Sequence, residues 1–423
     1  MTHRLLILGT LGEFVQLVQK SKARGYYTIV CDGYPDGEAR AYADASYVIP
    51  VTDTDAIAKL CIEENVDGII TSFSDLLMEC MVKIAAKAGI PCYLKPDQLP
   101  WYRDKSVCRK TLTDLGLPSP GYSKISVDCN DIEEIKVQIA GLNYPLISKP
   151  MDKYGSRGIF IIRDENSLKE KLEHTAEFTD LDEILVEEYN DGYEFNMMTW
   201  VCDGNVNVIS IADREKTFPG EDMLPISTRN VYPSCLIHEV YEPARNLLQS
   251  YIEHTGQTEG PLSMQFFWKR GDGIEVCEIA ARFFGYEHEL TDIVYGFNIE
   301  ELLLDGTYAK DRVVKMFAEH DIFTPKRHGA VLYFHGRLLK VADESSAYLL
   351  SKDEAVIKPW IFYNEGETVI EYGPNPYMAL YYVAKDSRTE LDELTNHFFE
   401  TMHITDPDGV EVTYRNQIPD YSL

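Results

Sequence analysis

Two lysines in this chain occupy positions from which an ammonium group can reach a bound phosphate. Lys149 ends an apolar strand expected over residues 144–150, and the loop after it contains Gly155 and Gly158. A lysine at the mouth of a sheet acts on phosphate as a point charge, and glycines let a loop present backbone N–H groups to anionic oxygens. Lys105 begins a helix further upstream. Taken alone, Lys105 is best explained as a solvated side chain, whereas a surface hairpin explains the Lys149 pattern about as well as phosphate binding does.

Two acidic residues end another expected strand, over residues 184–189. Glu187 and Glu188 precede a turn at Gly192. A strand that stops at such a turn offers unpaired backbone groups to an adenine ring and a carboxylate to the hydroxyls of a ribose. Acidic residues before a turn are otherwise simply solvated, so this pattern matters only together with the others.

The last pattern is a hairpin with Gln265 on its first strand and Glu278 on its second, followed by Arg282. Two oxygen ligands that face each other suit Mg²⁺, which takes few protein ligands in addition to phosphates. Alternation along the strand puts Glu278, Ala280 and Arg282 on one face, where a guanidinium can steady a phosphoryl group in transfer. A surface hairpin with a polar cross-strand pair is the alternative.

The elements that position these residues follow from hydrophobic periodicity. Up to about residue 95, apolar strands alternate with amphipathic helices, which predicts a doubly wound parallel sheet with ligands at the carboxyl ends of its strands. Gly9 and Gly12 followed by Asp32 resemble part of a dinucleotide-binding pattern. Val15 stands where the third glycine belongs, so a tight strand-to-helix turn is the preferred interpretation.

After residue 122 the expected elements become short strands separated by turns, which predicts a mostly antiparallel, α+β organisation. The hairpin over residues 263–280 belongs to this part, and helices are expected over residues 289–294 and 299–304. A last unit begins with a strand over residues 330–334 and contains a helix over residues 386–400.

The composition excludes several classes of partner. The formal net charge is −29, with 40 Lys and Arg against 69 Asp and Glu, so nucleic acid and anionic membranes are not expected partners. The nine cysteines contain no CxxC pair, which favours a reducing cytoplasm over disulfides or structural zinc. The sequence contains no apolar run of the length that a membrane helix needs, and the short apolar N-terminus is not a signal peptide. We expect a soluble cytoplasmic protein whose few cations gather in its binding cleft.

In this order, the four patterns resemble the ATP-grasp superfamily, close to its carboxylate–amine ligases and the large chain of carbamoyl-phosphate synthase. The resemblance covers about residues 1–305. It implies an α/β pre-ATP-grasp domain over residues 1–95 and an ATP-grasp domain over residues 96–305, whose lid spans about 120–190. An α+β unit over residues 306–423 is expected to complete the ligase.

The resemblance also implies roles for individual residues. Gln265 and Glu278 would bind Mg²⁺, with two ions expected, and Arg282 and Arg229 are the leading candidates for holding the substrate carboxylate. Where the family usually has Glu-x-Asn-x-Arg, Ala280 replaces the asparagine. This leaves three alternatives: one Mg²⁺ ion is held more weakly, water or substrate completes its coordination shell, or catalysis is impaired. The residues implied to bind ATP are Lys105, Lys149, Tyr154, Gly155, Ser156, Gly158, Glu187, Glu188, Tyr189, Asn190 and Glu194.

The favoured function is an ATP-dependent ligase that joins a small carboxylate to an amine through an acyl phosphate. The expected partners are therefore two small molecules, and a homodimer is a possible assembly. A bicarbonate-activating enzyme and a non-catalytic nucleotide sensor are the alternatives. Arg214, Lys216 and His288 lie in segments that face the reaction centre by resemblance, although an ordinary surface or satisfied role explains them equally well. Residues 287–289 are consecutive and cannot all point one way, so no metal site is predicted there.

Overall fold

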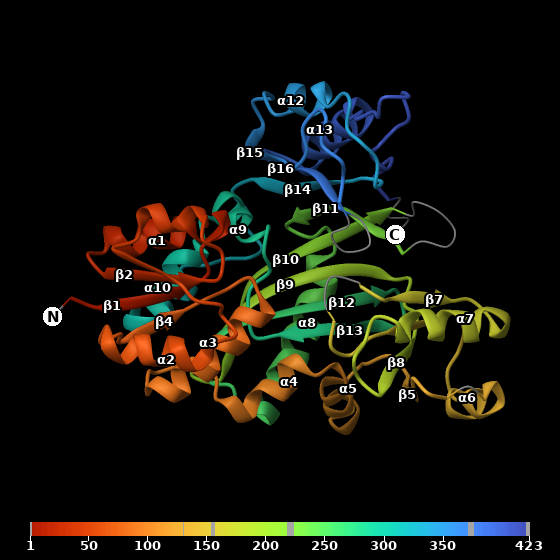
Figure 1. The fold of residues 1–423 in the computed structure, drawn as a ribbon, viewed down its shortest axis with the longest axis horizontal. Helices are drawn as coiled ribbons and strands as arrows, with labels where there is room; N and C mark the ends of the chain where they lie inside the picture. The colour runs from red at the N-terminus through yellow and green to blue at the C-terminus, as the bar shows by residue number, and fades with distance from the viewer. Residues whose placement is uncertain (1, 130, 154–156, 218–223, 371–375, 420–423) are drawn as a thin grey trace.

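The structure is a computed structural model that describes residues 2–129, 131–153, 157–217, 224–370 and 376–419. The described residues are built around three β-sheets (Figure 1). We call them the N-terminal sheet, the small sheet and the large sheet. The N-terminal sheet and the small sheet lie at opposite ends of the large sheet in this view (Figure 1). None of the helices in the described ranges is long and apolar enough to cross a membrane.

The N-terminal sheet has four parallel strands in the order β3-β2-β1-β4, and the predicted doubly wound arrangement is confirmed. Gly9, directly after β1, has a φ of +118°, and a Cβ there would lie 2.3 Å from the ring of Phe14. The turn therefore requires glycine for packing, as the tight-turn interpretation holds. The strands are β1 (Arg4–Leu8), β2 (Tyr27–Asp32), β3 (Ala45–Val48) and β4 (Gly68–Ile70), and the helices are α1 (Val15–Ala23), α2 (Thr54–Glu63) and α3 (Asp75–Ala88).

The small sheet is antiparallel, in the order β5-β8-β6-β7, and has a hydrophobic core of its own. Its core residues come from the sheet and from the two helices that cover it, so it packs as a unit distinct from the large sheet. The strands are β5 (Tyr122–Ser126), β6 (Leu146–Lys149), β7 (Phe160–Ile162) and β8 (Glu183–Glu188); the covering helices are α6 (Ile132–Gln138) and α7 (Glu165–Ala176). Helices α4 (Leu99–Arg103) and α5 (Lys105–Asp114) lead into it.

The large sheet has eight antiparallel strands in the order β13-β12-β9-β10-β11-β14-β16-β15. Its last three strands belong to the expected C-terminal α+β unit, so that unit extends the sheet of the preceding part. The strands are β9 (Tyr193–Cys202), β10 (Asn205–Thr217), β11 (Ile226–Tyr232), β12 (Glu259–Lys269), β13 (Gly273–Ala280), β14 (His328–His335), β15 (Val356–Ile361) and β16 (Tyr377–Lys385).

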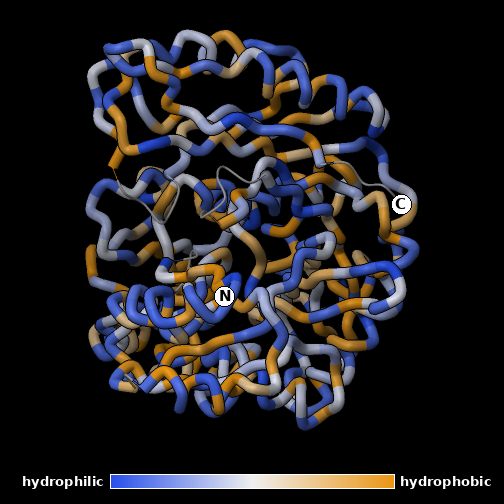
Figure 2. The backbone as a smooth tube through the Cα atoms, turned by 90° about the vertical axis from the view of Figure 1, so that its right-hand side faces the viewer, coloured by the Kyte–Doolittle hydropathy of each residue, from blue (hydrophilic) through white to orange (hydrophobic). Residues whose placement is uncertain are grey.

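Helices cover the large sheet and connect it to the N-terminal sheet. The long amphipathic helix α8 packs its buried face against β10 and β13, and α10 contacts α1 and β4 of the N-terminal sheet. Hydrophilic and hydrophobic stretches alternate along the backbone (Figure 2). The helices of this part are α8 (Ile237–Thr255), α9 (His288–Tyr295), α10 (Ile299–Tyr308), α11 (Lys310–Ala318), α12 (Ser345–Leu350) and α13 (Arg388–Thr401).

Candidate active site

A buried ion-pair network lies where the small sheet meets the large sheet. Lys149, the last residue of β6, pairs with Glu187 of the neighbouring strand β8. Arg109 of α5 donates from Nε to Oε1 of Glu187 at 2.6 Å. Glu187 is 2% exposed; burial alone raises a carboxyl pKa, but Arg109 and Lys149 outweigh it and hold the pKa of Glu187 at about 2. The carboxylate is therefore ionised and fixes both cations at the rim of a cleft.

Helix α5 supplies two of the cations from one face. Lys105 and Arg109 are four residues apart, so their side chains project from the same side of the helix. The helix begins at Lys105 because the Asp104 side chain accepts a hydrogen bond from the Ser106 amide at 2.8 Å. Lys105 Nζ donates to the Lys153 carbonyl at 2.8 Å, and burial lowers the pKa of its ammonium group.

The predicted metal ligands lie side by side on one face of the large sheet. Gln265 of β12 is directly opposite Glu278 of β13 on one side and Asn196 of β9 on the other. Residues directly opposite in antiparallel strands share a face, and Glu194 shares it because it lies two residues before Asn196. Glu194 accepts a hydrogen bond from Arg214 of β10 at 2.6 Å and another from Gln265. The metal and ribose candidates therefore form one continuous polar surface.

Arg282 ties this surface to the N-terminal sheet. It follows β13 and forms a bidentate ion pair with Asp75, the first residue of α3, with distances of 2.9 and 2.7 Å. Asp75 lies beyond the carboxyl end of β4, at the edge where ligands of parallel sheets bind. The guanidinium of Arg282 is thus held in a fixed orientation, as bidentate recognition requires.

A cleft of about 500 Å³ joins these features. Its lining contains five carboxylates, from Asp75, Glu79, Asp104, Asp152 and Glu278. It contains eight cations, from Arg103, Lys105, Arg109, Lys149, Lys153, Arg157, Arg214 and Arg282. In the whole chain the 69 acidic residues far outnumber the 40 basic ones, so the cleft reverses the charge balance of the protein. A cleft with this lining is suited to a polyanion.

A second cavity of about 390 Å³ shares Arg214 with the cleft and includes Tyr189 and Glu194 among its lining residues. Lys216 of β10 lines it as well and forms an ion pair with Glu194. Glu194 is 5% exposed; its burial raises the pKa of the carboxyl group, but Arg214 and Lys216 lower it further than burial raises it. The ionised carboxylate is therefore available as a hydrogen-bond acceptor between the two cavities.

Other predicted ATP-binding residues are placed differently. Glu188 points away from the cleft and accepts hydrogen bonds from the backbone and side chain of Asn143, at 2.9 and 2.7 Å. Asn190 closes its own turn, accepting from the Gly192 amide at 2.8 Å. Gly158 packs against Phe178, which a Cβ would approach to 2.5 Å. Tyr154, Gly155 and Ser156 lie outside the described residues.

Arg229 is not brought to the cleft, although the sequence analysis made it a leading candidate for the substrate carboxylate. It is fully buried and pairs with Glu215 of β10 and Asp392 of α13. Successive residues of a strand point to opposite faces, so Asn230 faces the cleft side of the sheet while Arg229 faces α13. Its guanidinium joins that helix to the sheet and is not available to a substrate.

Sequence reasoning missed several residues that line the cleft. Arg109 could have been found from its spacing to Lys105, because positions i and i+4 share a helix face. Asp75 lies at a strand end where ligands were expected, although no role was predicted for it. Arg103 carries no comparable signal, since its place depends on how α4 packs beside α3 and β13. Arg214, which the sequence left undecided, lines both cavities.

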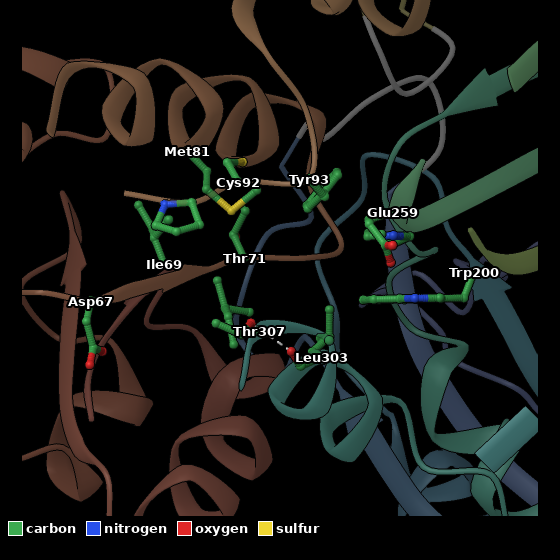
Figure 3. Close-up of a pocket in the computed structure, with 15 residues that line it drawn as sticks. Asp67, Ile69, Thr71, Met81, Cys92, Tyr93, Trp200, Glu259, Leu303 and Thr307 are labelled. Carbon is green, nitrogen blue, oxygen red and sulfur yellow. Dashed lines mark hydrogen bonds between the residues drawn. The ribbon is translucent and has the colours of Figure 1, made fainter. Parts of the chain in front are cut away.

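Another cavity, of about 230 Å³, lies between β4, α10 and the start of β12 (Figure 3). Its walls are largely apolar, including Ile69, Met81 and Leu303, and its lining contains no lysine or arginine. It therefore lacks the charge that phosphate binding needs. Tyr93 of this cavity donates a hydrogen bond to the Ala281 carbonyl at 2.7 Å, next to Arg282.

Comparison with known proteins places this geometry in a family. The model of the ATP-grasp domain matches residues 142–289, which include the strands from β6 to β13 and much of the cleft. The chain carries an ATP-grasp domain. The predicted relationship to the ATP-grasp superfamily is therefore confirmed.

Curated relatives of this ATP-grasp protein are distant and longer than the matched part. The formate-dependent phosphoribosylglycinamide formyltransferase of Erythrobacter litoralis is 23% identical over 202 residues, which are 47% of this chain and 50% of the relative. The C-terminal section of the carbamoyl phosphate synthase large chain of Methanopyrus kandleri is 25% identical over 206 residues, 45% of this chain and 37% of that section. The chain thus spans half or less of the length of these relatives.

Solved structures confirm the fold over nearly the whole chain. The L-amino acid ligase of Bacillus licheniformis superposes with a TM-score of 0.77 at 18% identity, covering 96% of this chain and 99% of that one. Phosphoribosylglycinamide synthetase of Anaerococcus prevotii superposes with a TM-score of 0.72 at 17% identity, covering 96% and 100%. The N-terminal and C-terminal parts therefore belong to the shared architecture.

Proposed function

We propose that this protein is an ATP-dependent ligase that activates a small carboxylate as an acyl phosphate and transfers the acyl group to an amine. The products are an amide, ADP and phosphate. The observation that carries this proposal is the cleft, in which eight cations outnumber five carboxylates in a chain of net charge −29. Such a concentration of cations stabilises the charge of a triphosphate and of its transferring phosphoryl group.

ATP is proposed to lie along the cleft with its phosphates at Lys105 and Lys149. The adenine is placed at the end of β8, by the segment from Glu187 to Asn190, and the ribose at Glu194. Lys149 already pairs with Glu187, whose pKa of about 2 keeps it anionic throughout the neutral range. The lysine is thus held at the cleft before the nucleotide binds, which lowers the ordering cost of binding.

Gln265 and Glu278 fit a site for Mg²⁺. Both supply oxygen atoms, which Mg²⁺ prefers, and Glu278 forms no ion pair with any residue that the structure describes. A carboxylate without an ion-pair partner on the wall of a cationic cleft is well placed for a divalent ion that also binds phosphate. Ala280, two residues on, provides no third ligand, so we propose that phosphate or water oxygens complete the shell. The ion would neutralise phosphate charge during transfer.

The two chemical steps then follow from the charges in the cleft. In the first, the substrate carboxylate attacks the γ-phosphorus and the bond to ADP breaks, while Lys149 and Arg282 stabilise the equatorial oxygens. In the second, an amine attacks the carbonyl carbon and inorganic phosphate leaves. Arg282 is held for both steps by its bidentate pair with Asp75, and this rigidity favours positioning.

The choice of an amine as the nucleophile rests on the similar proteins rather than on the residues of the cleft. The superposed structures are a ligase for L-amino acids and a phosphoribosylglycinamide synthetase. Their identities below 20% support the fold, and their names suggest a carboxylate such as an amino acid and a nitrogen nucleophile. We therefore propose amino acids as the first substrate class to examine.

A screen for ADP release tests this function. The protein is incubated with Mg²⁺·ATP and pairs of amino acids, and the products are identified by mass spectrometry; release of ADP with a new amide supports the proposal. Release driven by bicarbonate alone would instead indicate a carboxylase-like enzyme, and tight ATP binding without turnover a nucleotide sensor. The Glu278→Ala variant should lose ADP formation while keeping its fold, and full activity in a well-folded variant would overturn the metal assignment.

A further inference from the structure

Glu287 is a deeply buried carboxylate that the proposed chemistry has not yet used. It lies at the end of the segment between β13 and α9 and is 4% exposed. Oε1 accepts hydrogen bonds from the side-chain amides of Asn196 and Asn230 at 2.8 and 2.7 Å, and Oε2 accepts one from the Tyr232 hydroxyl. All three donors project from the face of the large sheet that carries Gln265 and Arg214.

The position of Glu287 relative to the cleft follows from strand register. Asn196 is directly opposite Gln265, so the two Cα atoms are about 5 Å apart. The Glu287 carboxylate is thus one hydrogen bond beyond a direct neighbour of the proposed metal ligand. Arg214 and Arg282 line the cleft, and Glu287 is close enough to both to raise the pKa of each guanidinium. Glu287 therefore lies within electrostatic reach of two arginines that line the cleft in which the acyl phosphate would form.

No cation compensates Glu287 directly. Among the described residues, none of the Lys, Arg or His side chains forms an ion pair with it, because Arg214 is bound to Glu194 and Arg282 to Asp75. Burial raises the pKa of Glu287 to about 7, although the Tyr232 hydroxyl and Arg214 oppose the shift. A buried carboxylate without a paired cation is costly. The charged and titratable groups that face it are Arg214, Tyr232, Arg282, Tyr333 and Tyr382.

Two acceptor atoms beside Glu287 also lack donors. Asn196 Oδ1 and Asn230 Oδ1 are buried, and no residue in the described ranges donates a hydrogen bond to either. Their orientation is fixed, because turning either amide around would bring its oxygen against the Glu287 carboxylate. Buried polar atoms are normally satisfied, so these two oxygens call for a donor that the protein itself does not provide. An ammonium group carries three N–H donors and a positive charge.

We propose that Glu287 binds the ammonium group of the nucleophilic substrate and removes its proton, with Asn196 and Asn230 accepting the remaining hydrogen bonds. This inference rests on the proposed ligase function and narrows the nucleophile to an amine that is protonated at neutral pH, such as an alkyl amine or the α-ammonium group of an amino acid. Aromatic rings beside the carboxylate suit the same cation; the rings of Tyr333 and Tyr377 are tilted by 35° to each other, with centroids 5.8 Å apart.

The proton and electron balance of the step is simple. R–NH₃⁺ gives one proton to the Glu287 carboxylate and becomes R–NH₂. The nitrogen lone pair forms the C–N bond to the acyl carbon, the bond from that carbon to the phosphate oxygen breaks, and inorganic phosphate leaves. The second proton on nitrogen is lost to the departing phosphate, and Glu287 returns its own proton to solvent.

Hydroxylamine distinguishes this role from a structural one, because it is largely uncharged at neutral pH and attacks acyl phosphates without a base. In the Glu287→Gln variant, amide formation at pH 7 should fall by about 10²-fold or more, the usual contribution of a general base. Formation of the acyl hydroxamate should stay within about threefold of wild type. Glu300→Gln is the matched control, because Glu300 is also buried, at 2%, but contacts His288 rather than the cleft.

The pH profile provides the second measurement. In the wild type, amide formation should decline below about pH 7 as Glu287 becomes protonated, whereas the Glu287→Gln variant should lack this limb. If that variant does not fold, Tyr232→Phe removes the hydrogen bond that lowers the pKa of Glu287 and should move the limb to higher pH. Equal losses with both nucleophiles, or no loss with either, would overturn the inference. A wild-type protein that yields neither ADP nor hydroxamate would overturn the ligase proposal itself.

Discussion

Replacing Arg229 with methionine should destabilise the protein without weakening nucleotide binding. Arg229 and its partner Glu215 are both fully buried, and Arg229 also pairs with Asp392 and donates to Thr395 Oγ1 at 3.0 Å. Methionine has similar length and no charge, so the variant leaves Glu215 buried with Arg388 as its remaining cation. Removing one partner of a buried ion pair costs about 3–5 kcal/mol, a large share of the 5–15 kcal/mol that is typical for a domain.

The size of this loss should depend on pH in a stated direction. Burial raises the pKa of Glu215 in the folded protein, and Arg229 opposes that shift. Without Arg229 the pKa of Glu215 rises further, because the buried carboxylate has lost a neighbouring positive charge. Keeping Glu215 ionised at neutral pH then costs more free energy in the folded protein. A raised carboxyl pKa means that the folded state binds a proton more readily than the unfolded state. The destabilisation should therefore shrink as the pH falls from the raised pKa toward the ordinary value of 4.5.

Urea unfolding at pH 7.5 and pH 5, together with calorimetric titration of Mg²⁺·ATP, measures both effects. Lys59→Met is the control, because Lys59 is 77% exposed and pairs with Glu63 on a helix surface, an interaction worth under about 0.5 kcal/mol. We expect the dissociation constant for ATP to change less than twofold in Arg229→Met. Unchanged stability in Arg229→Met would refute this account, in which the guanidinium joins α13 to the sheet.

Three further predictions concern the cleft. Lys149→Met should raise the dissociation constant of Mg²⁺·ATP at least about tenfold, because a charge-assisted contact is worth about 1.5–3 kcal/mol; unchanged affinity in a titration would contradict the phosphate assignment. The pKa of Glu187 is lowered from 4.5 to about 2, so its ionised carboxylate should contribute about 3 kcal/mol to the free energy of unfolding above pH 4.5, and this contribution is lost as the pH falls toward 2. Glu187→Gln should flatten this acid dependence of the unfolding free energy, and an unaltered slope would count against the prediction. Ala280→Asn should lower the Mg²⁺ concentration at which ADP formation is half-maximal, and an unshifted Mg²⁺ titration would argue against a missing metal ligand.

The sequence predicted the local elements of this protein well because their signals are local. The amphipathic helices expected before about residue 95 include α3, because Ser74 caps its start and Gly89 ends it with a φ of +71°. The hairpin that carries Gln265 and Glu278 was also predicted with the correct register. Helix α8 was not predicted; Pro243 lies inside it, where a proline normally signals a break.

Tertiary relationships were harder to predict because they depend on which faces meet. Arg229 and Asn230 are adjacent in sequence, yet only Asn230 lies on the cleft side of the sheet. Choosing between them requires knowing which face of β11 packs against α13. Likewise, the ion pair of Lys149 with Glu187 joins strands that are 38 positions apart at these residues, and nothing in either motif specifies their contact. The sequence also does not show that β14 pairs with β11, so the way the C-terminal unit joins the large sheet could not be predicted.

Transfer of oxygen from the substrate carboxylate to phosphate tests the central proposal most directly. The protein is incubated with Mg²⁺·ATP and a mixture of amino acids whose carboxylates carry ¹⁸O, and the inorganic phosphate is analysed by mass spectrometry. An acyl phosphate requires the attacking carboxylate oxygen to depart with the phosphoryl group, so each phosphate released with an amide should contain one ¹⁸O atom. Phosphate released with an amide but without the label would show that the carboxylate is not activated by phosphorylation.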